Sequence, residues 1–253
     1  MAILNLLFNR SILIISVWCI TLGATMVQAD QKIEIRTIGI PPYGIQNNAG
    51  FSGIYYDTAN LLAKETGYQV NNLIYPYARI INELKSGQTD MTIMFKYKEL
   101  EPYVVYIAPL ATLKNVVIGL KGTIFDSFDS LKGKKLAYLR GAKFSDRVDN
   151  NPEIFSVVTD DFIQGINILL ARRVDGIIGP LEPILSAAKS VVHDRYIFDD
   201  PFVVSERTPW VQISRKSADR ISEEKLKLKF IDLKQKHKLE LIRDKYLKPL
   251  SPE

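Results

Sequence analysis

Two copies of one sequence pattern constrain the fold of this chain more than any other feature. In each copy an apolar helical run leads through a turn to an Asp and then into a buried strand. The copies span residues 80–91 and 168–178, with Gly87 in the first turn and Arg172 and Arg173 in the second. A helix that leads into a buried strand is the repeating unit of α/β proteins with largely parallel sheets. The pattern therefore predicts an α/β fold with two lobes.

The rest of the chain alternates in the same way between β-rich and helical runs. The strands are expected at residues 33–40, 70–75, 91–95, 116–120, 136–139, 155–158, 176–178 and 210–214. Two helices of the first half are expected to stop at Gly67 and Gly87. A later helix is expected to begin after Asp161, with Gln164 placed to complete a capping box.

The N-terminus has the order of regions found in a secretory leader. Arg10 precedes an apolar run at residues 12–22, and small and polar residues follow up to Ala29. Since the apolar run is shorter than the roughly 20 residues of a membrane span, we expect a signal peptide cleaved after Ala29. Cys19 lies inside this leader, so the mature chain is expected to have no disulfide and no thiolate metal site.

The net charge of +5 is concentrated near the C-terminus, where residues 215–253 hold 12 Lys or Arg against 7 Asp or Glu. One interpretation is the solvated face of a helix, and the other is a patch for anions or nucleic acid. Leu226, Phe230 and Leu233 keep helical spacing, which favours a long basic helix packed on the first lobe. Nucleic acid is therefore not an expected partner.

The residues give no sign of a reaction centre. The two histidines, His193 and His237, lack metal-ligand spacing, and no nucleophile has an evident base beside it. Asp199 and Asp200 are interpreted as turn or cap residues, not as an acid/base pair. The chain is thus expected to be neither an enzyme nor a holder of a metal or other cofactor.

Six short motifs occur in an order and spacing that resemble a known family. They are Pro41-Pro42-Tyr43, Gly53-Ile54-Tyr55-Tyr56-Asp57, and the motifs at residues 84–90, 131–136, 173–175 and 242–246. Over essentially the whole mature sequence, the chain resembles the bacterial extracellular solute-binding proteins of family 3, of the polar-amino-acid-binding type.

That resemblance implies a two-lobed type II periplasmic-binding-protein fold with a ligand cleft, two hinge crossings and closure by hinge motion. The crossings are expected at residues 113–120 and 204–214. The leader is assigned to residues 1–29, the first lobe to 30–115 plus 208–253, and the second to 116–207. The resemblance also implies a periplasmic monomer that delivers a small molecule to the membrane permease of an ABC-type transporter.

The chain departs from the family pattern where amino-acid binders hold the head of their ligand. Tyr97 and Leu100 stand where the family has a Thr and a carboxylate-binding Arg. Ala142 follows Gly141 in place of a Thr, and Gly179 replaces an Asp that meets the amino group. A carboxylate buried without partners costs several kcal/mol. Our hypothesis is therefore that the chain does not bind α-amino acids in the usual way.

Other residues at the carboxyl ends of the strands, where ligands of α/β sheets bind, could replace this clamp. The cationic candidates are Arg79, Lys96 and Arg140, with simple solvated charges as the alternative. Backbone N–H groups at Gly141 and Ala142 could open a helix and bind an anion. The remaining candidates are an aromatic wall, which could equally be plain core, and Glu182 for an amino group; the wall consists of Tyr43, Phe51, Tyr77 and Phe95.

These candidates predict a small solute that is amino-acid-like, anionic or aromatic-faced. Two alternatives to transport stay open on the same fold. One is a ligand-sensing module, and the other is a periplasmic lyase similar to cyclohexadienyl dehydratases, which would need an acid/base group in the cleft.

Overall fold

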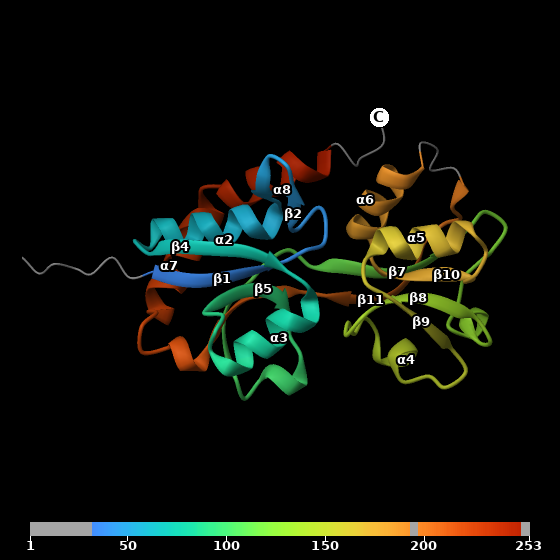
Figure 1. The fold of residues 1–253 in the computed structure, drawn as a ribbon, viewed down its shortest axis with the longest axis horizontal. Helices are drawn as coiled ribbons and strands as arrows, with labels where there is room; N and C mark the ends of the chain where they lie inside the picture. Colours follow the sequence, from blue (N-terminus) through green and yellow to red (C-terminus); the bar gives the residue numbers. More distant parts are fainter. Residues whose placement is uncertain (1–31, 193–196, 249–253) are drawn as a thin grey trace, which may run out of the picture. The chain divides into compact units, whose positions relative to one another are not determined.

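The computed structural model describes residues 32–192 and 197–248. The expected leader and His193 lie outside these ranges. The described chain forms two five-stranded sheets, each flanked by helices (Figure 1), together with one small hairpin. We call each large sheet with its helices a lobe, numbered in chain order.

The first lobe has the strand order β4-β1-β5-β12-β6. Its strands are β1 (Lys32–Ile38), β4 (Gln69–Tyr75), β5 (Met91–Phe95), β6 (Val104–Pro109) and β12 (Pro209–Ser214). Strand β1 runs parallel to β4 and β5, and β12 runs antiparallel to β5 and β6. The helices α2 (Ile54–Glu65) and α3 (Tyr77–Ser86) pack against it, and the hairpin consists of β2 (Ile45–Asn47) and β3 (Gly50–Ser52).

The second lobe has the strand order β11-β7-β10-β8-β9. Its strands are β7 (Leu113–Gly119), β8 (Lys135–Leu139), β9 (Phe155–Thr159), β10 (Gly176–Pro180) and β11 (Phe202–Arg207). Its helices are the short α4 (Asp146–Asp149), α5 (Phe162–Leu170) and α6 (Leu181–Val191). The predicted α/β class and the two-sheet organisation are thus confirmed.

The helix boundaries follow the predicted local signals. Gly67 and Gly87 adopt φ values of 81° and 80°, which only glycine reaches at low cost, and they end α2 and α3. The Asp161 carboxylate accepts from the Gln164 N–H at 2.7 Å, while the Gln164 amide oxygen accepts from the Asp160 N–H at 2.8 Å. The Gln164 side chain therefore bonds the N–H one residue before the N-cap Asp161, whereas a standard capping box would use the N–H of the N-cap itself.

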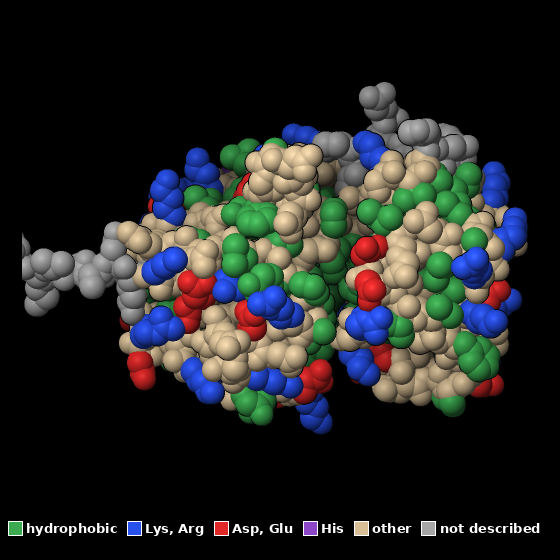
Figure 2. All heavy atoms as spheres, in the orientation of Figure 1, with side chains coloured by type: hydrophobic (Ala, Val, Ile, Leu, Met, Phe, Trp, Pro, Cys, Tyr) green, Lys and Arg blue, Asp and Glu red, His purple; other side chains and the backbone are tan. Residues whose placement is uncertain are grey.

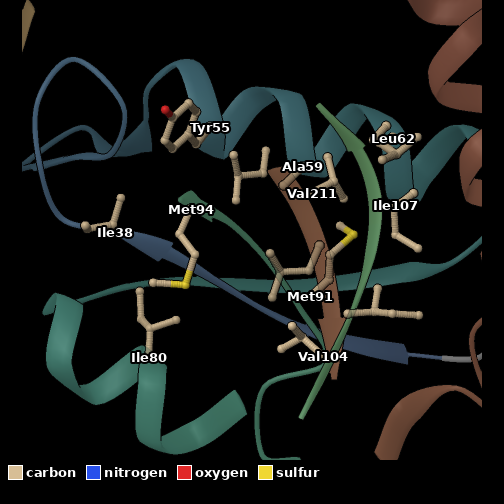
Figure 3. Close-up of a cluster of buried hydrophobic side chains, with 14 of the residues drawn as sticks. Ile38, Tyr55, Ala59, Leu62, Ile80, Met91, Met94, Val104, Ile107 and Val211 are labelled. Atoms are coloured by element: carbon tan, nitrogen blue, oxygen red, sulfur yellow. The ribbon is translucent and has the colours of Figure 1, made fainter. Parts of the chain in front are cut away.

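The core of the first lobe lies between its sheet and its helices. Figure 3 shows apolar side chains from α2, α3 and the sheet converging there, with Leu62 and Met91 fully buried. Burial of such side chains is the main favourable term in folding. This packed core positions the strand ends that form the site.

The C-terminal region packs on the first lobe, as predicted, but as two helices and not one. These are α7 (Glu223–Gln235) and α8 (Lys238–Leu247), separated at His237, whose φ of 54° breaks the helix. The predicted apolar side chains Leu226, Phe230 and Leu233 are buried in the core of the first lobe.

Two short connections join the lobes. One is residues 110–112, between β6 and β7, and the other is Thr208, between β11 and β12. The first lies just before the expected segment 113–120, because β7 already pairs with β10 and β11 in the second sheet. The two connections touch each other: the Thr112 and Thr208 hydroxyl oxygens lie 2.7 Å apart, and the Leu110 N–H donates to the Pro209 carbonyl at 2.9 Å.

Within the described ranges, no helix combines the length and apolar character that a membrane crossing needs.

Candidate functional site

A pocket of about 50 Å³ lies between the strand ends of the two lobes. The first lobe contributes the ends of β1 and β5 and the first turn of α3. The second contributes the ends of β8 and β10 and the first turn of α5. Figure 2 shows a groove between the lobes with hydrophobic side chains along its walls.

Aromatic and other apolar side chains form the pocket wall, and no Asp, Glu, Lys or Arg is among the described residues that line it. Seven lining residues are aromatic: Tyr43, Tyr55, Tyr77, Phe95, Tyr97, Phe144 and Phe162. The Tyr43 and Tyr55 rings stack with centroids 4.3 Å apart, and the Tyr77 and Tyr97 rings meet edge to face at 5.7 Å. Such pairs hold each other in fixed orientations.

The tyrosine hydroxyls supply the polar groups of this wall. The Tyr43 hydroxyl donates to a Glu182 carboxylate oxygen at 3.4 Å, which links the first lobe to α6. The Tyr77 hydroxyl is buried and interacts with the Tyr97 hydroxyl, but it forms no hydrogen bond of good geometry to the described residues. Burial raises the pKa of Tyr43, Tyr55 and Tyr77 well above the usual tyrosine range. All three are therefore neutral hydroxyls at neutral pH.

The lobes are in direct contact around the pocket. A Cβ built on Gly141 would lie 3.8 Å from the Cβ of Ala78, across the gap between the lobes. Arg207 donates to the carbonyl oxygens of Lys96 in the first lobe and Lys143 in the second. The structure therefore has the lobes closed on each other.

The closed pocket is too small for a ring. A cavity of about 150 Å³ holds benzene, and this pocket has about 50 Å³. Any ring-sized ligand requires the lobes to part, and the two short connections are the segments about which they can do so.

Four of the predicted site residues line the pocket: Tyr43, Tyr77, Phe95 and Ala142. Phe51 does not. It lies on the hairpin strand β3, is 36% exposed, and has its ring 6.0 Å from that of Tyr56. The wall that was expected from four aromatics thus includes three of them.

The predicted cations have other partners. Arg79 lies in the first turn of α3, as expected, but its guanidinium pairs with Glu83 at 2.8 Å and covers the Tyr75 ring. Arg140 pairs with Asp160 at 2.8 Å on the surface. The Lys96 ammonium lies 3.6 Å from the centroid of the Trp210 ring. None of the three lines the pocket, and their contact with a ligand stays a prediction.

Gly141 forms the predicted turn, with a φ of 74°, but no helix opens there. The next helix, α4, starts only at Asp146. The Asp149 carboxylate already accepts from the N–H groups of Phe144 and Ser145. The expected helix opening at Gly141 was therefore wrong, and anion binding by the N–H groups there stays a prediction.

The positions that depart from the amino-acid clamp are filled with apolar groups. A Cβ on Gly179 would come within 2.5 Å of the Phe162 ring, so that ring occupies the space of an acidic side chain there. Leu100 is fully buried, and Tyr97 lines the pocket. Hydrophobic packing thus replaces two of the three polar groups that the family pattern would place here.

Tyr55, Tyr97, Phe144, Phe162 and Arg207 were missed as site residues. Phe162 is the first residue of α5, as Tyr77 is of α3, so the rule that found Tyr77 could have found it. A weaker indication exists for Arg207, which lies two residues before Pro209 within the expected crossing at residues 204–214. The described residues contain no group of His, Cys, Asp and Glu side chains suited to a metal ion.

Comparison with solved structures gives the same architecture. The chain is similar to a mutant arginine-binding protein (ArgBP) from T. maritima, at 17% identity and a TM-score of 0.74, over 88% of this chain and 97% of that chain. It is similar to a histidine kinase sensor domain at 15% identity and a TM-score of 0.74, over 85% and 96% of the two chains. The substrate binding protein of an amino acid ABC transporter matches at 19% identity and a TM-score of 0.72, over 86% and 99%.

No curated protein sequence gives a significant match. The family model for bacterial extracellular solute-binding proteins, family 3, matches residues 35–249, nearly all of the chain beyond the expected leader. The two-lobed fold, the pocket between the lobes and this match agree, and the chain belongs to the bacterial extracellular solute-binding proteins of family 3.

Proposed function

We propose that this protein binds a small solute with an aromatic or apolar body in the pocket between its lobes. The observation that carries the proposal is the pocket wall, with seven aromatic side chains and no charged one among the described lining residues. Aromatic walls favour ligands with flat or apolar bodies, because they bury large apolar areas and stack on rings.

The same wall argues against recognition of a ligand through the charged head of an α-amino acid. Its ammonium would lose water on entering this pocket and would find no acidic partner among the described lining residues, and burial of an unpaired charge is unfavourable. The Phe162 ring fills the space beside Gly179, where the family pattern would place an acid.

A pair of matched variants tests the proposal. Phe144→Leu removes a ring from the pocket wall, whereas Phe51→Leu removes one from the exposed hairpin. With 3-phenylpropionate as probe, Phe144→Leu is expected to weaken binding about tenfold, or about 1.4 kcal/mol, and Phe51→Leu to leave it unchanged. Equal dissociation constants for Phe144→Leu and the wild type would place the ligand elsewhere.

We further propose that the protein is exported to the periplasm and presents its ligand to a membrane permease. The leader pattern and the family support this role, as does the similarity to the substrate binding protein of an amino acid ABC transporter. Uptake of labelled ligand by cells should fall when the gene is deleted and return when it is restored.

Sensing is the second candidate, and the similarity to a histidine kinase sensor domain favours it. In that case deletion would leave uptake unchanged and abolish a transcriptional response to the ligand. The two outcomes separate the two roles.

A further inference from the structure

We propose that the ligand carries an acidic group, and that Arg207 and the Tyr77 hydroxyl receive it at one end of the pocket. This inference rests on the proposed function, because it assumes that the body of the ligand occupies the aromatic pocket.

Arg207 lies where both lobes meet. It is the last residue of β11, and its guanidinium donates to the backbone carbonyls of Lys96 and Lys143. The same guanidinium lies 4.8 Å from the ring centroids of Phe95 and Tyr97, both of which line the pocket. The cation is thus held against the pocket wall by carbonyl acceptors. The Asp149 carboxylate lies within its electrostatic reach, but none of the ion pairs found among the described residues involves Arg207.

An open groove of about 650 Å³ adjoins the pocket at this point. Tyr97 and Phe144 line both the pocket and the groove, and Arg207 lines the groove beside them. Arg207 therefore stands at the junction, where the end of a ligand that filled the pocket would emerge.

The groove has a surplus of positive charge among its described lining residues. Five are cationic and three acidic, namely Lys96, Lys98, Lys143, Arg147 and Arg207 against Glu99, Asp146 and Asp149. One of the acids, Asp149, is already engaged by two backbone N–H groups. The junction thus favours an anion over a cation.

Tyr77 provides a second donor from the pocket side. Its side chain is 8% exposed and lines the pocket, and its hydroxyl interacts with that of Tyr97 without forming a hydrogen bond of good geometry to any described residue. A buried hydroxyl without an acceptor is unfavourable, and an acceptor on the ligand would satisfy it. Burial raises the pKa of this hydroxyl, and the Arg207 charge opposes part of the increase, so the two groups are within electrostatic reach.

A carboxylate fits these donors best. It can accept two parallel N–H bonds from a guanidinium, and such charge-assisted bonds are stronger than those to the carbonyls that Arg207 now contacts. When the lobes part, the guanidinium loses at least one of those carbonyls, because they belong to different lobes. The freed N–H groups are then available to the acid.

The test uses a matched probe pair, 3-phenylpropionate and its neutral amide, titrated by calorimetry into the full mature protein. The wild type is expected to bind the acid at least tenfold more tightly than the amide. Arg207→Gln should weaken the acid at least tenfold and the amide less than twofold, and Arg207→Lys should keep part of the preference because its charge remains. Tyr77→Phe should weaken the acid several-fold.

Arg215→Gln is the matched control, since Arg215 also donates to a backbone carbonyl, that of Glu101, but lines neither the pocket nor the groove, and it should leave both affinities unchanged. Equal wild-type affinity for acid and amide, or an equal loss of both in Arg207→Gln, would overturn the inference and leave the aromatic pocket standing. Failure of both probes to bind the wild type, in a titration that also includes indole-3-propionate and its amide, would instead overturn the proposed function, and this inference with it.

Discussion

A disulfide between the lobes gives a quantitative test of the closed arrangement. The variant combines Ala78→Cys and Gly141→Cys. The Cβ of Ala78 and a Cβ built on Gly141 lie 3.8 Å apart, and the Cβ atoms of a disulfide lie about 3.8 Å apart on average. The described residues contain no cysteine, so no other thiol there competes.

The expected gain in stability follows from the size of the loop. The new bond closes a loop of 141 − 78 = 63 residues, for which the chain-entropy model gives about 4 kcal/mol. A cysteine at position 141 must adopt the positive φ of the glycine, 74°, at a cost of roughly 1 kcal/mol. The net gain of about 3 kcal/mol corresponds to a rise in Tm of roughly 6–12 °C for a chain of this length.

The assay compares oxidised and reduced protein. Thiol titration and intact mass should show complete closure of the bond under mild oxidation, and the oxidised form should melt higher. It should also lose affinity for 3-phenylpropionate, because the closed pocket cannot admit a ring. The two single-cysteine variants and the Ala78→Ser, Gly141→Ser double variant serve as controls. Thiols that stay free under oxidation would refute the close approach of the lobes at this point.

Three further outcomes are expected. The Glu83 carboxylate contacts Arg36, Arg79 and Thr89. Burial raises the pKa of Glu83, but the hydrogen bonds from Arg79 and Thr89 and the charge of Arg36 outweigh burial, so the net pKa is lowered. Glu83→Gln should therefore lower the unfolding free energy by about 2 kcal/mol at pH 7. This difference from the wild type should disappear as the pH falls through the lowered pKa of Glu83, which lies below about 4.3. A difference that is unchanged in acid would contradict its ionic origin. Trp210 contacts Lys96, whose carbonyl accepts from Arg207, so its fluorescence should change when a ligand parts the lobes; an unchanged spectrum with a bound ligand would count against this coupling. The wild type should not turn over prephenate, and turnover that is lost in Glu182→Ala would overturn the assignment as a binding protein.

The architecture was predictable because local signals in this chain agree with the fold. Strand β5 matches its predicted bounds, and the glycine stops and the Asp161 cap are where sequence chemistry requires them. The break at His237 was missed, because a non-glycine residue with positive φ leaves no mark in the apolar spacing.

The site was predictable only in part, for a different physical reason. The ends of parallel strands locate a pocket, and this rule found Tyr77 and Phe95. The Arg79–Glu83 pair is four residues apart on one helix, so the spacing rule for helical ion pairs could have found it. The carbonyls that Arg207 contacts belong to Lys96 and Lys143, which are distant in sequence, and no local pattern predicts them.

The most direct test of the central claim is a thermal-shift comparison of matched ligands that differ only in an α-amino group. Phenylalanine is compared with 3-phenylpropionate, and tryptophan with indole-3-propionate, each at high concentration. At 100 times its dissociation constant a ligand stabilises by about 2.7 kcal/mol, or roughly 5–10 °C in Tm for a chain of this length. We expect this rise with the compounds that lack the amino group and none with the amino acids. An equal or larger rise with the amino acids would contradict the account.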